Sequence, residues 1–168
     1  MFFNLAFSDD NKVRQLLIDK QPYPALLRLL DHSDNYVVSD AIVSIVNLII
    51  TGSNTTPSNS HHPHFEIISS AGGIKRIFAL FQSYNSNKFI KDTACLCLGI
   101  LFRAKEFTNV LMKNSIIKHI KTLLTDSDDW TKQSAKFSLK DINQNEGNQK
   151  NDDDDEEEED DDDNDDKE

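Results

Sequence analysis

The sequence predicts an all-α fold, a superhelix of about three similar helical units followed by a disordered acidic tail. The chain has 168 residues, enough for about one domain. Only five residues are Gly and four are Pro, while Leu and Ile are abundant, a composition that favours helices. One apolar pattern recurs about every forty residues, a spacing typical of helical repeat proteins. Because each such unit buries its apolar face against the next, the pattern predicts a solenoid.

The same apolar skeleton occurs three times along the body of the chain. In each copy an Ile or Leu segment ending in Leu-Leu or Leu-Phe precedes a second apolar ladder that starts with Ala. The ladders begin at Ala41, Ala94 and Ala135. The pattern predicts units over about 8–52, 64–104 and 105–143, which together form one repeat domain, 8–143.

Each unit divides further, giving about nine helices in total. In the first unit we expect helices over about 9–20, 24–31 and 34–50, with Pro22 ending the first of them. The third helix of every unit is preceded by a serine in the same alignment column, a residue type that caps helix N-termini. These predicted caps are Ser33, Ser86 and Ser127.

Two segments lack the apolar pattern. The insert 51–64 is rich in Ser, Asn, Pro and His, which predicts a surface loop. Residues 152–168 contain fifteen acidic side chains and one Lys, so this segment carries −14 while residues 1–151 carry +3. A run of one charge sign with nothing apolar to bury cannot offset its chain entropy. We therefore expect residues 144–168 to form a disordered acidic tail.

Two segments resemble the armadillo family. The string 71–81, AGGIKRIFALF, is similar to the armadillo signature, in which a glycine turn joins two helices before an Ile/Leu ladder. Residues 41–48 resemble the family's Ala…Leu-x-Asn-Leu ending, and the likeness covers about 8–143. In the related importin-alpha branch, the matching Asn holds the backbone of an extended peptide in a concave groove. Asn47 occupies that column here.

The resemblance implies a groove lined by the third helices. Helical spacing of about 100° per residue places the groove candidates on the face around Asn47 and its counterparts in the other two units. The candidates are Tyr36, Asp40, Val43, Ser44, Asn47, Phe89, Thr93, Leu96, Cys97, Ile100, Trp130, Ser134, Phe137, Ser138 and Asp141.

An aromatic residue stands eleven positions before the Asn column in every unit, at Tyr36, Phe89 and Trp130. Two hypotheses remain open for this column. Exposed aromatics would anchor a partner, since they are rigid and enriched in binding hot spots. Buried aromatics would instead fill the junction between the second and third helices of each unit.

The residues that could carry chemistry do not form a known catalytic pattern. We find no Gly-rich phosphate loop, nucleophile elbow or paired catalytic carboxylates. His61, His62 and His64 lie in the insert and are predicted to be solvated rather than metal ligands. Cys95 is predicted to pack between helices and Cys97 to line the groove. The sequence therefore predicts no enzyme, no metal and no cofactor.

The composition also indicates in which cellular compartment the protein is expected. The apolar start 1–7 is short and lacks a basic region, which argues against a secretory signal, and no run approaches the ~20 apolar residues of a membrane span. Two cysteines two positions apart fit a reducing compartment. We expect an intracellular protein, cytoplasmic or nuclear.

Two functions are compatible with these observations. The first is a non-enzymatic protein–protein interaction module that binds an extended peptide or partner helix in the groove. The alternative is a carrier or chaperone for basic cargo, of the histone or nuclear-transport type, acting through the acidic tail. Basic proteins are then possible partners. We do not expect a nucleic-acid partner, because the tail would repel phosphate, and we expect no membrane partner.

Overall fold

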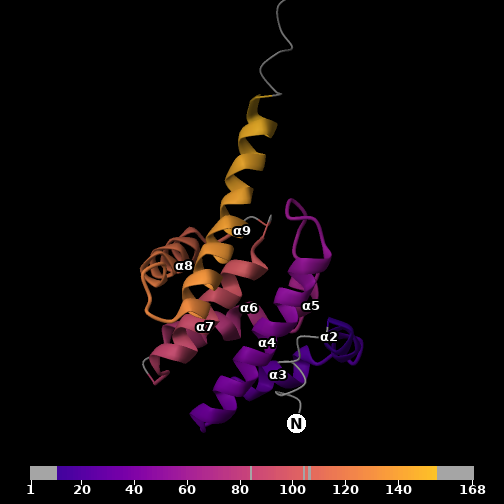
Figure 1. The fold of residues 1–168 in the computed structure, drawn as a ribbon, viewed down its shortest axis with the longest axis vertical. Helices are drawn as coiled ribbons and strands as arrows, with labels where there is room; N and C mark the ends of the chain where they lie inside the picture. Colours follow the sequence, from indigo (N-terminus) through magenta and orange to yellow (C-terminus); the bar gives the residue numbers. More distant parts are fainter. Residues whose placement is uncertain (1–10, 84, 104, 106, 155–168) are drawn as a thin grey trace, which may run out of the picture.

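The structure is a computed structural model that describes residues 11–83, 85–103, 105 and 107–154. Within this part of the chain there are eight helices and no strand, which confirms the predicted all-α fold (Figure 1). The helices are α2 (Asn11–Ile18), α3 (Tyr23–Leu29), α4 (Asn35–Thr55), α5 (Phe65–Ser70), α6 (Gly73–Gln82), α7 (Lys88–Leu101), α8 (Val110–Leu123) and α9 (Asp129–Asp154).

The helices follow the order expected for repeated units. Helices α2, α3 and α4 come in the first predicted unit, and α5, α6 and α7 come in the second. The third unit contributes α8 and α9, one helix fewer than expected. Among its described residues, the chain before α8 is irregular, and Asn109 caps α8 by accepting a hydrogen bond from the backbone N–H of Met112.

Helix α7 lies at the centre of the fold. It contacts α4, α6, α8 and α9, and Figure 1 shows it between α4 and α9. Every residue from Asp92 to Leu101 is buried. A helix buried on all sides is stable in water only when other elements cover it, and α4, α6, α8 and α9 supply that cover.

The turn between α5 and α6 depends on two glycines. Gly72 has a φ of 72°, a left-handed conformation that other residues rarely adopt. A Cβ atom at Gly73 would lie 2.6 Å from a methyl group of Ile68 and 2.9 Å from a methyl group of Leu27. Glycine here therefore lets α6 approach both α5 and α3.

The helix caps are repeated in register, but one residue later than predicted. The capping side chains are Asp34, Asn87 and Asp128, which accept from the backbone N–H groups of Tyr36, Ile90 and Thr131 at 2.8, 2.9 and 2.7 Å. The serines before them do not cap these helices. An N-cap residue must place its side chain against the first free amides, and the serines precede that position.

The insert 51–64 is an exposed loop only in part, because its beginning is helical and several of its residues are buried. Its first five residues extend α4 to Thr55, and Arg103, just after α7, binds the rest of the insert. The Arg103 Nε and Nη1 atoms donate to the carbonyl oxygens of Ser60 and Ser53, both at 3.1 Å, and Nη2 donates to the Thr56 hydroxyl. Arg103 is only 1% exposed. The sequence of the insert is rich in Pro and Ser, but it does not reveal that the guanidinium of Arg103, distant along the chain, binds the insert.

Helix α9 continues past the predicted end of the domain at residue 143. It reaches Asp154 and extends beyond the other helices in Figure 1. No Pro interrupts residues 144–154; four Gln, Glu and Lys residues there favour a helix, whereas Gly147 and six Asn and Asp residues do not. The rest of the predicted tail, residues 155–168, lies outside the described residues.

One described helix, α4, is long and apolar enough to cross a membrane by length and composition alone. Two thirds of the relevant stretch is buried inside the molecule. The core helix of a soluble protein passes the same test, so this observation is weak evidence for a membrane span.

We predict that Asp34→Ala lowers the free energy of unfolding by about 1 kcal/mol, because it removes the side chain that caps α4. The matched change Ser33→Ala should alter stability by less than about 0.5 kcal/mol, since Ser33 is an exposed neighbour that does not cap. Urea unfolding of both variants measures the difference. A larger loss of stability in Ser33→Ala than in Asp34→Ala would instead identify Ser33 as the capping residue.

We predict that Arg103→Ala destabilises the protein by about 2–4 kcal/mol, because buried acceptors in the insert would lose their donor. Arg28→Ala is the control, because Arg28 is exposed on α3. Chemical denaturation should show a lower midpoint for the first variant only. Equal midpoints would mean that the insert does not depend on Arg103.

Candidate protein-binding groove

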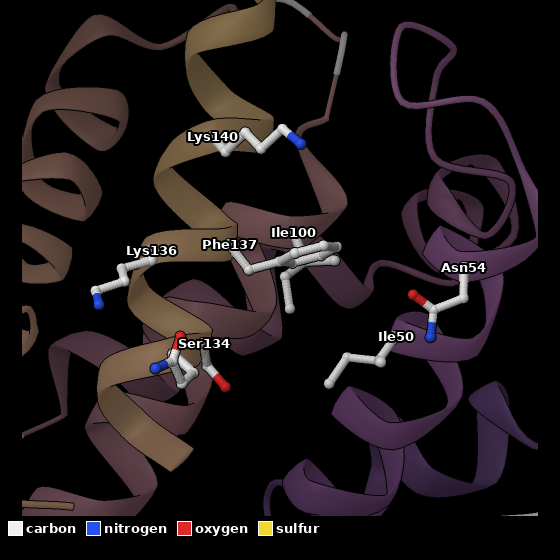
Figure 2. Close-up of a pocket in the computed structure, with 8 residues that line it drawn as sticks. Ile50, Asn54, Ile100, Ser134, Lys136, Phe137 and Lys140 are labelled. Atoms are coloured by element: carbon white, nitrogen blue, oxygen red, sulfur yellow. The ribbon is translucent and has the colours of Figure 1, made fainter. Parts of the chain in front are cut away.

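A groove opens where the C-terminal parts of α4 and α7 meet α9. Its volume is about 440 Å³. Figure 2 shows the side chains of α4 facing those of α9 across it, with α7 between them. The lining residues are Ile50, Asn54, Ile100, Gln133, Ser134, Lys136, Phe137 and Lys140. The groove therefore lies on the third helices of the units.

The groove has an apolar floor and a polar edge. In Figure 2, Phe137 extends from α9 over Ile100 of α7, and Ile50 of α4 points toward them from the other wall. Lys140 reaches across the opening, whereas Lys136 lines the groove with its stem and points outward. An apolar floor with polar groups at its margin suits an amphipathic segment of another protein.

Some of the predicted groove residues occupy the groove or its surroundings. Ile100, Ser134 and Phe137 line it, although the Ile100 side chain is itself buried. Asp40 is exposed on α4 but is not among the lining residues. Asn47 is half-buried, and its Nδ2 atom is buried without a hydrogen-bond partner in the described part of the chain. That amide group is not presented to a bound peptide in this arrangement.

The other predicted residues on this face are buried, which corrects their assignment to an open surface. They are Val43, Ser44, Thr93, Leu96, Cys97, Ser138 and Asp141. The reason is that the third helices touch one another. The Ser138 hydroxyl donates to the Leu96 carbonyl oxygen at 3.3 Å, and a Cβ atom at Gly99 would come within 2.8 Å of the Ser138 Cβ.

The three aromatic residues are exposed rather than buried. Tyr36 is 85% exposed, Phe89 is 48% exposed and Trp130 is 39% exposed. This argues against the hypothesis that they fill a helix junction. Tyr36 also borders a separate cavity of about 350 Å³ between the starts of α4 and α7, lined with Asn87. Their use as anchors for a partner stays a prediction.

Several lining residues lie outside the predicted set, namely Ile50, Asn54, Gln133, Lys136 and Lys140. The predicted third helix of the first unit ends at residue 50, whereas α4 continues to Thr55. The groove opens at the ends of α4 and α7, while the middle of α7 is covered. The polar run 51–55 contains no proline, which was the available signal that the helix could continue.

Two of the three histidines in the insert are buried, contrary to the predicted solvated loop. His62 is 2% exposed, and its Nε2 lies 2.9 Å from the Ile49 carbonyl oxygen while its Nδ1 accepts from the His64 N–H. The Tyr23 hydroxyl lies 2.6 Å from His64 Nδ1. Burial lowers the pKa of His62 to about 3 and that of His64 to about 4. Both imidazole rings are therefore neutral, and with these partners they contribute to the packing of the insert against α3 and α4.

The described residues contain no group of three or more His, Cys, Asp or Glu that could hold a metal. Cys95 and Cys97 are both fully buried, and burial raises the pKa of both thiols. Cys97 therefore belongs to the core rather than to the groove. A protonated buried thiol is a poor nucleophile, so neither residue suggests a reaction.

An ionic cluster connects α7 to the last two helices. Asp92 is buried on α7 and contacts His119 Nε2 on α8 at 2.7 Å and Lys88 Nζ at 2.6 Å. Lys88 also contacts Asp126, before α9, at 2.7 Å. The pKa of Lys88 is raised, mainly by its hydrogen bond to Asp126 and secondly by its hydrogen bond to Asp92. The cluster lies away from the residues that line the groove.

Fold and groove together define an armadillo-type helical repeat protein with its candidate surface on the third helices. Among solved structures, the chain is similar to a designed armadillo repeat protein. The TM-score is 0.54 with 17% sequence identity, covering 84% of this chain and 55% of that chain. This likeness confirms the predicted fold, and the chain spans about half the length of the designed protein.

A comparison of this sequence with models of protein families identifies its family. The family model for the H subunit of the V-ATPase matches residues 2–153, and the chain belongs to this family. A search of curated protein sequences finds no match. The armadillo resemblance predicted from the glycine turn and the Ile/Leu ladder is thus confirmed as a fold type.

We predict that stability falls as the pH drops from about 6.5 toward 4. The unfolded histidines bind protons near pH 6.5, whereas His62 and His64 resist protonation until about pH 3 and 4. Each contributes up to ~1.4 kcal/mol of lost stability per pH unit inside that window. Asp141 opposes this loss, because burial raises its pKa to about 6 and its native state takes up a proton before the unfolded state does, but the two histidines together outweigh it. Urea unfolding between pH 7 and 4.5 measures the slope.

The matched variants for this measurement are His62→Gln and His61→Gln. The first should flatten the slope, because it removes one buried neutral ring. The second should leave the slope unchanged, because His61 is exposed. An identical slope in all three proteins would contradict the assignment.

Proposed function

We propose that this chain is a non-enzymatic interaction unit that holds a segment of another protein in the groove between α4, α7 and α9. The observation that carries the proposal is the groove itself. It is open to solvent, has a floor of Ile50, Ile100 and Phe137, and is bordered by side chains that can donate or accept hydrogen bonds. A helix or extended strand with one large apolar side chain fits such a surface.

Membership of the V-ATPase H-subunit family suggests the class of partner. We propose that the bound segment belongs to another V-ATPase subunit, so that this chain acts as a regulatory or scaffolding part of that assembly. Repeat proteins commonly bind along the surface formed by their stacked units, which is where the groove lies. A cytoplasmic location, predicted from the sequence, remains part of the proposal.

We predict that Asn54→Trp weakens binding to a V-ATPase assembly lacking its H subunit by at least about tenfold, or ~1.4 kcal/mol. Asn54 is exposed at the end of α4, and an indole there would obstruct the groove. Binding is measured by sedimentation of the purified full chain with the assembly.

The matched control is Asn114→Trp, the same change at an exposed position on α8 away from the groove. It should bind as the unmodified chain does. Circular dichroism establishes that both variants are folded. Equal binding by the two tryptophan variants would overturn the groove as the binding site.

A further inference from the structure

The apolar surface of the groove continues along α9 toward the start of that helix. Ser134 and Phe137 line the groove, and Figure 2 shows them on α9 beside it. Trp130 stands four residues before Ser134. Residues three and four apart lie on one side of a helix, so Trp130 lies on the side of α9 that lines the groove. Its side chain is 39% exposed, which leaves the indole open to a partner.

This side of α9 has two large side chains with a small one between them. Trp130 and Phe137 are seven residues apart, which corresponds to about 10.5 Å along the helix axis at 1.5 Å per residue. Ser134, between them, leaves space for a large side chain of a neighbouring helix. Apolar residues one turn away on either side of that side chain then contact the two rings. The pattern on α9 therefore matches a helix with apolar residues at i, i+3 or i+4, and i+7.

The walls of the groove offer little to the backbone of an extended segment. They are the helices α4, α7 and α9, whose backbone N–H and C=O groups are already bonded within each helix. The floor of Ile50, Ile100 and Phe137 is apolar. Backbone groups of an extended segment that lie against this floor would lack partners, which is costly. A helix satisfies its own backbone, so the surface favours a helical occupant.

A carboxylate on α4 adds a charge requirement. Asp40 is exposed and makes no ion pair with the residues that the structure describes. It stands fourteen residues, nearly four turns, before the lining residue Asn54, and therefore lies on the same side of α4. The contact of Lys88 with Asp126 and the small cavity between the starts of α4 and α7 place the first turns of the three helices together. Asp40 and Trp130 thus lie toward the same end of the surface, where a basic side chain is complementary.

We propose that the occupant of the groove is an amphipathic α-helix of another protein that runs along α9 from the apolar floor to Trp130. Its apolar side chains contact Phe137, the space over Ser134, and Trp130, and a Lys or Arg near the Trp130 end pairs with Asp40. This inference rests on the proposed function, which leaves open whether the bound segment is helical or extended. It assigns the role of aromatic anchor to the ring on α9.

Equivalent exposed aromatics supply matched variants. Trp130→Ser should weaken binding of the full chain to a V-ATPase assembly lacking its H subunit by at least about tenfold, whereas Trp130→Phe, which keeps an apolar ring, should stay within about threefold. Phe89 stands two residues after the N-cap of α7, as Trp130 does on α9, and is 48% exposed. Phe89→Ser should leave binding unchanged. Sedimentation measures binding, and circular dichroism establishes that each variant is folded.

Charge reversal tests the basic end of the bound helix. Asp40→Lys should weaken binding several-fold at about 0.05 M salt, and the loss should shrink at about 0.5 M salt, where the Debye length is shorter. Asp19→Lys is the control, because Asp19 is exposed just after α2 and does not line the groove. It should bind as the unmodified chain does at both salt concentrations.

Photo-crosslinking within the bound assembly tests the form of the occupant. A photoreactive amino acid replaces either Gln133 or Lys140, which are exposed, line the groove and stand seven residues apart on α9. The two positions should link to partner residues about six to eight positions apart, because a helix along α9 has the same rise per residue. An extended segment would give a separation of about three, because it rises about 3.3 Å per residue.

The proposal is overturned by a cross-link separation of about three residues, by full binding of Trp130→Ser, or by an equal loss in Phe89→Ser or in Asp19→Lys. If Asn54→Trp still weakens binding in any of these cases, the groove stands as the binding site and only its helical occupant is wrong. Equal binding by Asn54→Trp and Asn114→Trp would instead overturn the proposed function, and this inference with it.

Discussion

The enclosure of α7 is the constraint on which the rest of the structure depends. Its residues Asp92–Leu101 are buried on every side, so α4, α6, α8 and α9 must each place an apolar face against it. A solenoid of many units would expose one edge of each third helix along a concave surface. Here the central third helix is enclosed by its neighbours, and Gly99 permits α9 to approach it closely. With the middle of α7 covered, the candidate groove opens at the helix ends, where α4 and α9 bound it.

Arg103 links the end of α7 to the insert through hydrogen bonds. It lies just after α7 and is buried, and all three of its donor nitrogens are used by residues of the insert. A buried guanidinium is tolerated only when its donors are satisfied, so the insert and the α7 terminus stabilise each other. His62 and His64 complete the arrangement through Ile49 and Tyr23, which join the insert to α4 and α3. A segment that resembles a loop in sequence is therefore a tertiary element beside the groove wall.

The groove has an apolar floor and a charged edge, and the two would act on a bound partner in different ways. Its apolar floor offers burial to a partner, and the lysines of α9 offer charge, which responds to salt.

The sequence by itself determined the helical class, the repeat and the glycine turn. These are local or periodic properties, because apolar spacing and a left-handed Gly72 can be recognised along the chain. It also named Ile100, Ser134 and Phe137, which line the groove, as candidate binding residues. Only the tertiary structure decided that Leu96 and Cys97 are covered, that His62 is buried, and that Lys140 reaches over the groove. The physical reason is that periodicity identifies which face of a helix is apolar, while burial depends on how closely neighbouring helices approach.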